Sequence, residues 1–151
     1  MTHRPFSETA AHLHAVYGAL MKEQRLWGDD YLDGLQLIAK TCGEALGARC
    51  SIWCYSDSRV ELRCQSLYAD GQVLARPKGP VFKQAEHTEY LNGLQDLRVL
   101  AADQALADAR LASFADYLRS NASVALMDAA IRTEGQVAGF IRWERQEPGH
   151  Q

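Results

Sequence analysis

The sequence predicts an α+β domain: an antiparallel sheet of about six strands, with long helices on one face and short helices and loops over a pocket on the other. Two hairpin patterns, one around Asp57 and one around Glu134-Gly135, favour antiparallel pairing. The third observation is the order of elements, helix–helix–strand–strand–strand–helix–strand–helix–strand–strand. This order is typical of helices that cover an antiparallel sheet.

The composition is typical of one globular domain. The chain has 151 residues, of which 47% are hydrophobic and 23% charged. A net charge of −3 without a Lys/Arg cluster argues against nucleic-acid binding. No apolar run approaches the ~20 residues of a membrane span, and the N-terminus has no signal-peptide core. We therefore expect a cytoplasmic protein without membrane insertion.

A first helix is expected from Ser7, its N-cap, to about Leu26. Three of its apolar residues lie seven positions apart, which is the interval of a coiled-coil seam. Two interpretations stay open, because the stripe could form a dimer interface or pack on the domain's own sheet. The interface residues would be Leu13, Val16, Leu20 and Trp27. We expect residues 1–28 to form this arm, used for dimerisation or signalling, and 29–151 to form the globular domain.

A second helix is expected to begin after Asp29 or Asp30 and to end at Leu46, with Gly47 just beyond its end. Apolar residues recur along it at helical spacing. They are Tyr31, Leu35, Ile38, Cys42 and Ala45. This stripe predicts that the helix covers one face of the sheet.

A hairpin is expected from strands at 49–55 and 60–68. Alternation places Cys50, Ile52 and Cys54 on one face of the first strand, with Trp53 and Tyr55 on the other. Both faces carry bulky residues, which indicates a central strand. The matching apolar face of the second strand is expected to comprise Val60, Leu62 and Cys64.

Short elements are expected in the next part of the chain. A strand at 72–75 leads through a Pro/Gly-rich loop at 76–80 to a small helix at 88–97 and a strand at 98–102. The inward side of the small helix would comprise Tyr90, Leu91, Leu94 and Leu97.

An irregular acidic connection at 103–108 ends at Asp108, which is expected to cap a helix at 111–118. Its inward residues would be Leu111, Phe114, Ala115 and Leu118. The chain then closes with strands at 124–132 and 136–144 around Gly135, since glycine accepts the positive φ of a tight hairpin turn.

From Tyr31 to Gly149 the chain resembles a GAF domain of bacterial signalling proteins. In that family an Arg-x-Ile-x-Ala-x-Asp-Ala stretch leads to Asp-x-Arg, then a helix, then Met-Leu-Asp-x-Pro-Ile-Arg and a Gly-rich turn. The counterparts here are Arg98, Ala102, Asp103 and Ala105, then Asp108 and Arg110, then Met127, Asp128, Ile131 and Arg132, and finally Gly135 and Gly139. The resemblance implies a sensory module of the kind that precedes a histidine kinase or a diguanylate cyclase.

The chain departs from the family pattern at several positions. Ala130 stands where the family usually has Pro, and Ser120-Asn121-Ala122 replaces a common Leu-Gly-Ile. The sequence ends at Gln151, where the family usually continues into a helix that joins an output domain. It could be a sensory segment of a larger protein or a short independent member.

The residues do not point to a catalytic centre. The histidines lie at the termini, on the first helix or, in the case of His87, at the start of the small helix, where we expect it to be solvated. No phosphate-binding glycine motif is present. The cysteines, expected to be buried free thiols, are Cys42, Cys50, Cys54 and Cys64. We therefore expect neither a metal nor a cofactor, and no enzymatic activity in this chain.

One enzyme reading remains as an alternative. Free methionine-(R)-sulfoxide reductases are single GAF domains of this length, and they need activated cysteines on the loops over the pocket. The segment that covers the expected pocket, 69–121, contains no cysteine. The preferred reading is therefore non-covalent sensing of a small molecule by a homodimer, and a dimerisation scaffold without a ligand is the second alternative.

Candidate pocket residues follow from the predicted elements and from the resemblance. They are Trp53, Tyr55, Tyr90, Arg98, Asp103, Arg110, Tyr117 and Asp128. Each also has a structural interpretation: Trp53 as core, Arg110 as a partner of a nearby aspartate, Asp128 as a buried acceptor. Arg98 and Arg110 together could bind a carboxylate or a phosphate, because guanidinium groups bind such anions with two hydrogen bonds. This favours an anionic metabolite slightly.

Overall fold

The computed structural model describes residues 5–8, 31–133 and 135–148. These residues form a seven-stranded sheet in the order β3-β2-β1-β7-β6-β5, with β4 paired to β2 beside this path. Every pairing is antiparallel, which confirms the predicted α+β class. The elements are α2 (Tyr31–Leu46), β1 (Arg49–Tyr55), β2 (Glu61–Ala69), β3 (Gln72–Ala75), β4 (Val81–Lys83), η2 (Gln84–Glu86), α3 (Thr88–Asp96), β5 (Val99–Ala102), η3 (Ala105–Ala107), η4 (Ala109–Phe114), α4 (Ala115–Ser120), β6 (Ser123–Thr133) and β7 (Gln136–Gln146).

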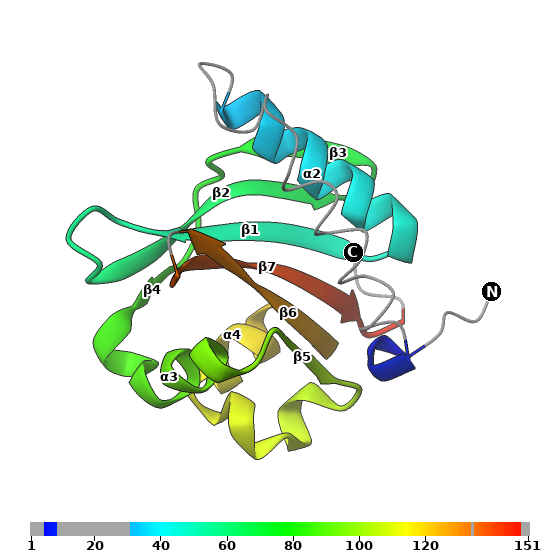
Figure 1. The fold of residues 1–151 in the computed structure, drawn as a ribbon. Coiled ribbons are helices and arrows are strands. Elements are labelled where there is room, and N and C mark those ends of the chain that lie inside the picture. Colours follow the sequence, from blue (N-terminus) through cyan, green and yellow to red (C-terminus); the bar gives the residue numbers. More distant parts are fainter. Residues whose placement is uncertain (1–4, 9–30, 134, 149–151) are drawn as a thin grey trace.

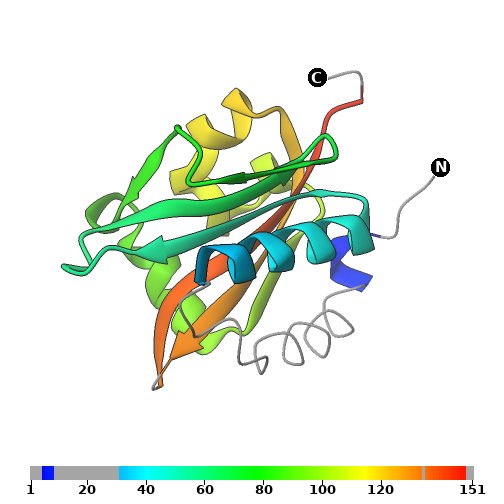
Figure 2. The ribbon, with the colours of Figure 1, turned by 90° about the horizontal axis from the view of Figure 1, so that it is seen from above.

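Helix α2 lies across one face of the sheet, and α3 and α4 lie on the opposite side (Figures 1 and 2). Its buried residues include Ile38, Ala39 and Cys42, and the indole nitrogen of Trp143 donates to the Cys42 carbonyl at 3.1 Å. The predicted stripe needs one correction: Ala45 is exposed. The helical period places Leu46 against the core instead.

The first hairpin forms as predicted, but the faces of β2 are different. Trp53 is opposite Cys64 in the ladder, so Leu62 and Cys64 share the face of Trp53 rather than that of Ile52. The register shifts between Ile52 and Trp53, and Gln65 is the extra residue on β2. The prediction for Val60 is also wrong, because its side chain is 60% exposed before the strand begins.

The closing hairpin also contains a bulge. Arg132 is opposite Val137, whereas Ile131 is opposite Gly139, so Ala138 is an extra residue on β7. An extra residue reverses the side-chain alternation beyond it. Ile141 therefore packs in the apolar core between α2 and the sheet, called the α2 core below. Arg142 faces the short helices on the other side.

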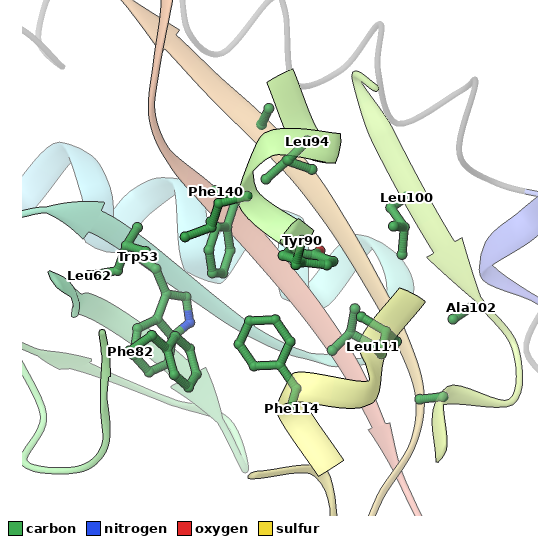
Figure 3. Close-up of a cluster of buried hydrophobic side chains, with 14 of the residues drawn as sticks. Trp53, Leu62, Phe82, Tyr90, Leu94, Leu100, Ala102, Leu111, Phe114 and Phe140 are labelled. Atoms are coloured by element: carbon green, nitrogen blue, oxygen red, sulfur yellow. The ribbon is translucent and has the colours of Figure 1, made fainter. Parts of the chain in front are cut away.

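The second face of the sheet is covered by short elements, as the sequence predicts. Below them lies an apolar cluster (Figure 3). Its larger members are Trp53, Leu62, Phe82, Tyr90, Leu91, Leu94, Leu100, Leu111, Phe114, Leu118, Leu126 and Phe140. Leu97 does not belong to it, because this residue ends α3 and is 41% exposed. Strand β4 lies outside the predicted set of strands.

Two polar contacts fix the short elements locally. Asp108 accepts from the backbone nitrogen of Arg110 at 3.0 Å, which confirms it as a cap, although the capped turn is 3-10. Arg132 donates to the carbonyls of Leu94 and Gln95 at the C-terminal end of α3. Such donors satisfy carbonyls that have no partner within the helix.

The N-terminal residues 5–8 dock beside the sheet. Phe6 is fully buried in the α2 core, and the guanidinium of Arg145 lies 4.3 Å from its ring centroid. Ser7 lies inside a helical turn and donates its hydroxyl to Asp103 at 2.5 Å, so it is not the predicted cap. The predicted dimer-interface residues fall within 9–30 and lie outside the described residues.

Candidate functional site

A groove of about 440 Å³ runs between α3, η4 and β5. Its buried lining residues are His87, Tyr90 and Leu100, and the rest of its lining is exposed. The exposed lining residues are Glu86, Glu89, Gly93, Leu97, Ala109, Arg110, Ala112 and Ser113. The groove is thus walled by the two short elements that cover the sheet.

The space between the sheet and these short elements is occupied by the protein's own side chains (Figure 3). Trp53 stacks on Phe82 with ring centroids 4.2 Å apart, and Phe82 meets Phe114 edge to face at 5.0 Å. The guanidinium of Arg142 lies among these rings, 4.3 Å from the centroid of Phe114 and 4.7 Å from that of Phe140. Arginine contacts of this kind are attractive because the faces of aromatic rings are electron-rich.

Arg142 is paired with Asp128 on the neighbouring strand. Its Nε and Nη2 each donate to one carboxylate oxygen at 2.8 Å, and both side chains have no exposed area. Burial by itself lowers the pKa of Arg142, but Asp128 holds that pKa well above its ordinary value. Tyr90 donates its hydroxyl to the same carboxylate, so α3 is joined to this buried pair.

A second buried carboxylate lies farther along β7. Glu144 accepts from Tyr117 at 2.9 Å and from Ser123 at 3.2 Å, and Arg49 lies 3.5 Å away. Burial raises the pKa of Glu144, although Arg142 and Arg49 oppose this effect. Tyr117 therefore connects α4 to the sheet.

His87 differs from its prediction as a solvated residue. It is only 6% exposed, and its Nδ1 lies 2.8 Å from the hydroxyl of Ser113. Its ring stacks on Phe114 at 4.1 Å. Burial and, secondly, the charge of Arg142 lower the pKa of His87 from its ordinary value.

Of the eight predicted pocket residues, the groove brings together Tyr90 and Arg110. Trp53 and Asp128 lie in the buried interior, and Tyr117 packs there with its hydroxyl on Glu144. The remaining three residues form contacts or lie elsewhere on the surface. Tyr55 donates to Gln84 at 2.6 Å, Asp103 accepts from Ser7, and Arg98 is exposed outside the groove lining.

The two arginines of the proposed anion site do not lie together in the groove. Arg110 pairs with Asp108 at 2.6 Å, and Asp108 in turn raises the pKa of Arg110 by its hydrogen bond. Arg98 is absent from the groove lining. The anion-binding arrangement of Arg98 and Arg110 thus stays a prediction.

Sequence reasoning did not identify Arg142, Glu144 or His87 as parts of this region. The signal for the first two was present, because Arg142 and Glu144 alternate with apolar residues inside the strand at 136–144. A charged residue in such a strand is buried only when it is paired. The buried position of His87 depends on stacking against Phe114, which is distant in sequence, as well as on the nearby Phe82.

None of the four cysteines, which all lie among the described residues, forms a disulfide, and none lines the groove. Cys42 and Cys50 are buried, as predicted, while Cys54 and Cys64 are half-buried. Burial raises the pKa of the Cys42 thiol to about 12. It is also the largest cause of the rise of the Cys64 pKa to about 12. A thiol with such a pKa carries little of the thiolate that sulfoxide reduction requires.

Among the described residues, no group of three or more His, Cys, Asp or Glu residues could hold a metal ion. None of the described helices is long and apolar enough to cross a membrane.

No protein-family model and no curated protein matches the sequence, whereas many solved structures match the fold. The GAF domain of Thermosynechococcus elongatus PixJ, in its blue-light absorbing form, has a TM-score of 0.64 and 14% identity over 81% of this chain and 73% of that one. Residues 122 to 287 of a methyl-accepting chemotaxis protein give a TM-score of 0.58 and 18% identity, over 87% and 82%. The GAF domain of an Acinetobacter phosphoenolpyruvate-protein phosphotransferase gives 0.59 and 12%, over 93% and 78%. With its antiparallel sheet between α2 and the short helices, the chain has a GAF-like fold.

Proposed function

We propose that this chain is a non-catalytic sensory module of a bacterial signalling protein, and that it binds a small molecule non-covalently in the groove between α3 and η4. The observation that carries this proposal is the construction of the groove. Its walls are short elements, and Tyr90 and His87 connect them to the buried Asp128 and to Ser113. The similar structures, which include a light-absorbing GAF domain and a chemotaxis protein, support a sensory role.

The lining of the groove favours a ligand with an apolar body. Leu97, Leu100 and Tyr90 supply apolar surface, and Glu86 and Glu89 supply carboxylates. The guanidinium of Arg110 is already paired with Asp108. This balance suits a neutral or cationic molecule better than the anionic metabolite that the sequence favours slightly.

The ligand would act by shifting a conformational equilibrium. A molecule that contacts both α3 and η4 binds best when the two elements keep one relative position. The buried contacts of Tyr90 and Tyr117 would then pass a change in this position to the sheet through Asp128 and Glu144. The output would be a dimer interface in the N-terminal arm or a kinase or cyclase segment of a larger protein.

A thermal-shift screen of small metabolites at pH 7.5 should find a ligand that raises Tm. A ligand present at 100 times its Kd contributes about 2.7 kcal/mol, or roughly 5–10 °C for a domain of this size. Gly93→Leu should abolish the rise, because a side chain at Gly93 meets open space and enters the groove.

The control for this screen is Arg98→Ala, outside the groove lining. It should keep the ligand effect, whereas loss of the effect in this variant alone would favour the anion site. A broad screen without any stabilising ligand, or a rise that persists in Gly93→Leu, would contradict the groove as the binding site.

The interior beneath the short elements is filled by the protein's own side chains, which favours a second function: a scaffold that dimerises without a ligand. The packing of Trp53, Phe82, Phe114 and Tyr117 into one cluster is the observation that favours it. In this case the regulatory property would be dimerisation through the N-terminal arm.

Analytical ultracentrifugation at several protein concentrations tests whether the N-terminal arm mediates dimerisation. If the stripe of Leu13 and Leu20 is the seam, lysine at both positions should give a folded monomer, since lysine cannot be buried in such a seam without a partner. Leu106→Lys is the control, because Leu106 is 53% exposed on the domain itself. A monomeric wild-type protein, or a dimer that survives the double replacement, would contradict dimerisation through this helix.

A further inference from the structure

His87 joins the two short elements that form the walls of the groove. It precedes α3, and its Nδ1 lies 2.8 Å from the Ser113 hydroxyl on η4. The imidazole ring stacks on Phe114 with an interplanar angle of 8°, and Phe82 meets it edge to face at 5.5 Å. One nearly buried ring thus holds the start of α3 against η4.

The charges around His87 are unevenly placed. Toward the interior, the guanidinium of Arg142 contacts the same Phe114 ring, 4.3 Å from its centroid. Toward the groove, the exposed groups include the carboxylates of Glu86 and Glu89. The charged and titratable groups on the elements packed around His87 include Arg142 on β7, Asp128 on β6, Tyr90 and Glu89 on α3, Glu86 on η2, Arg110 on η4 and Lys83 on β4.

A proton on His87 would therefore place a second cation beside Arg142 in a region with little water. Asp128 compensates for one positive charge, and its oxygens already accept from Arg142 and Tyr90. A charged imidazole would find carboxylate partners only toward the groove. Neutral His87 is more stable in the position where it contacts Ser113 and Phe114, which we call the closed position. Charged His87 is more stable where it is exposed to solvent and close to Glu86.

We propose that His87 is a proton-sensitive latch of the groove, which holds α3 on η4 when neutral and releases Ser113 and Phe114 when protonated. The inference rests on the proposed function only in taking this groove as the regulated site. Acidification would then loosen η4 and change the affinity of the groove for its ligand. This makes pH an input of the module, because histidine titrates in the physiological range.

The sign of the effect follows from the direction of the pKa shift. Burial and Arg142 lower the pKa of His87 in the closed state below its ordinary value of 6.5. The open state therefore binds more protons as the pH falls below about 6.5, and opening becomes easier. Between the two pKa values the opening constant should increase by up to about tenfold per pH unit.

Amide hydrogen exchange of residues 109–114, measured without ligand from pH 7.5 to 5.0 and corrected for intrinsic rates, tests the latch. The wild type should show increased opening below pH 6.5, and His87→Gln should not, since glutamine stays neutral. An NMR titration of the His87 imidazole, assigned by its absence in His87→Gln, should give a midpoint below 6.5. A midpoint at or above 6.5, or the same pH dependence in the variant, would overturn the proposal.

Ser113→Ala provides the matched control. It removes the hydroxyl partner but keeps the imidazole, so residues 109–114 should exchange faster already at pH 7.5. Unchanged exchange in Ser113→Ala would also overturn the latch. The difference between wild type and His87→Gln cancels the contribution of Glu144, whose pKa shift has the opposite sign. Because no ligand is used, a failed metabolite screen and a failed latch are separate results.

Discussion

Arg142→Met should destabilise the domain by about 3–5 kcal/mol, which is the usual cost of removing one partner of a buried ion pair. Asp128 would keep only the Tyr90 hydroxyl as a side-chain partner, in a site with no exposed area. The aromatic rings would also lose the guanidinium that contacts them. Urea unfolding of the purified variant measures the change in free energy.

Two comparisons make this prediction specific. Arg63→Met removes an arginine whose side chain is 61% exposed and whose ion pair with Glu61 lies at the surface, so it should cost about 0–1 kcal/mol. Asp128→Leu combined with Arg142→Met removes both charges and should be more stable than Arg142→Met alone, because no buried charge is left without a partner. A double variant as unstable as the single one would show that packing, not charge, determines the loss.

Gly139→Ala should also be strongly destabilising, by about 3 kcal/mol or more. A Cβ at this position would lie 1.9 Å from the Trp53 carbonyl oxygen and 2.9 Å from the Cys54 Cα. Both are backbone atoms of the central strand β1, which is opposite Gly139 in the ladder, so no side chain can move aside. Thermal unfolding should show a decrease in Tm of roughly 6–12 °C.

The matched control is Gly93→Ala. A Cβ at Gly93 meets nothing within 4 Å, and alanine favours a helix over glycine by about 0.5–1 kcal/mol. This variant should keep or raise Tm. A Gly139→Ala protein that unfolds at the wild-type temperature would mean that β1 and β7 can separate without cost, which contradicts the described register.

Local sequence patterns were sufficient for most of the elements. Helix α2 with Gly47 after it, the strand at 49–55 and the Asp108 cap depend on residues close in sequence, and all are found. The resemblance of the closing segments to GAF domains is confirmed at the level of the fold. Strand β4 was missed because three residues after a Pro/Gly loop give too short a pattern.

The interior beneath the candidate groove was less predictable because two bulges decide which side chains face it. A plain two-residue hairpin would place Asp128 opposite Ile141; the extra residue Ala138 places it opposite Arg142 instead. The bulge at Gln65 similarly moves Leu62 and Cys64 to the Trp53 face. A bulge is stabilised by packing across the sheet, so alternation within one strand does not reveal it.

The sequence by itself determined most of the described helices and strands, the antiparallel class and the absence of a cysteine from 69–121. These properties depend on periodicity and composition, which act over a few residues. The tertiary structure alone decided that Arg142 meets Asp128, that His87 is buried beside Ser113, and that Tyr90 and Arg110 share a groove while Arg98 lies outside its lining. These pairs are distant along the chain, and the register of the sheet and the docking of the short helices bring them together.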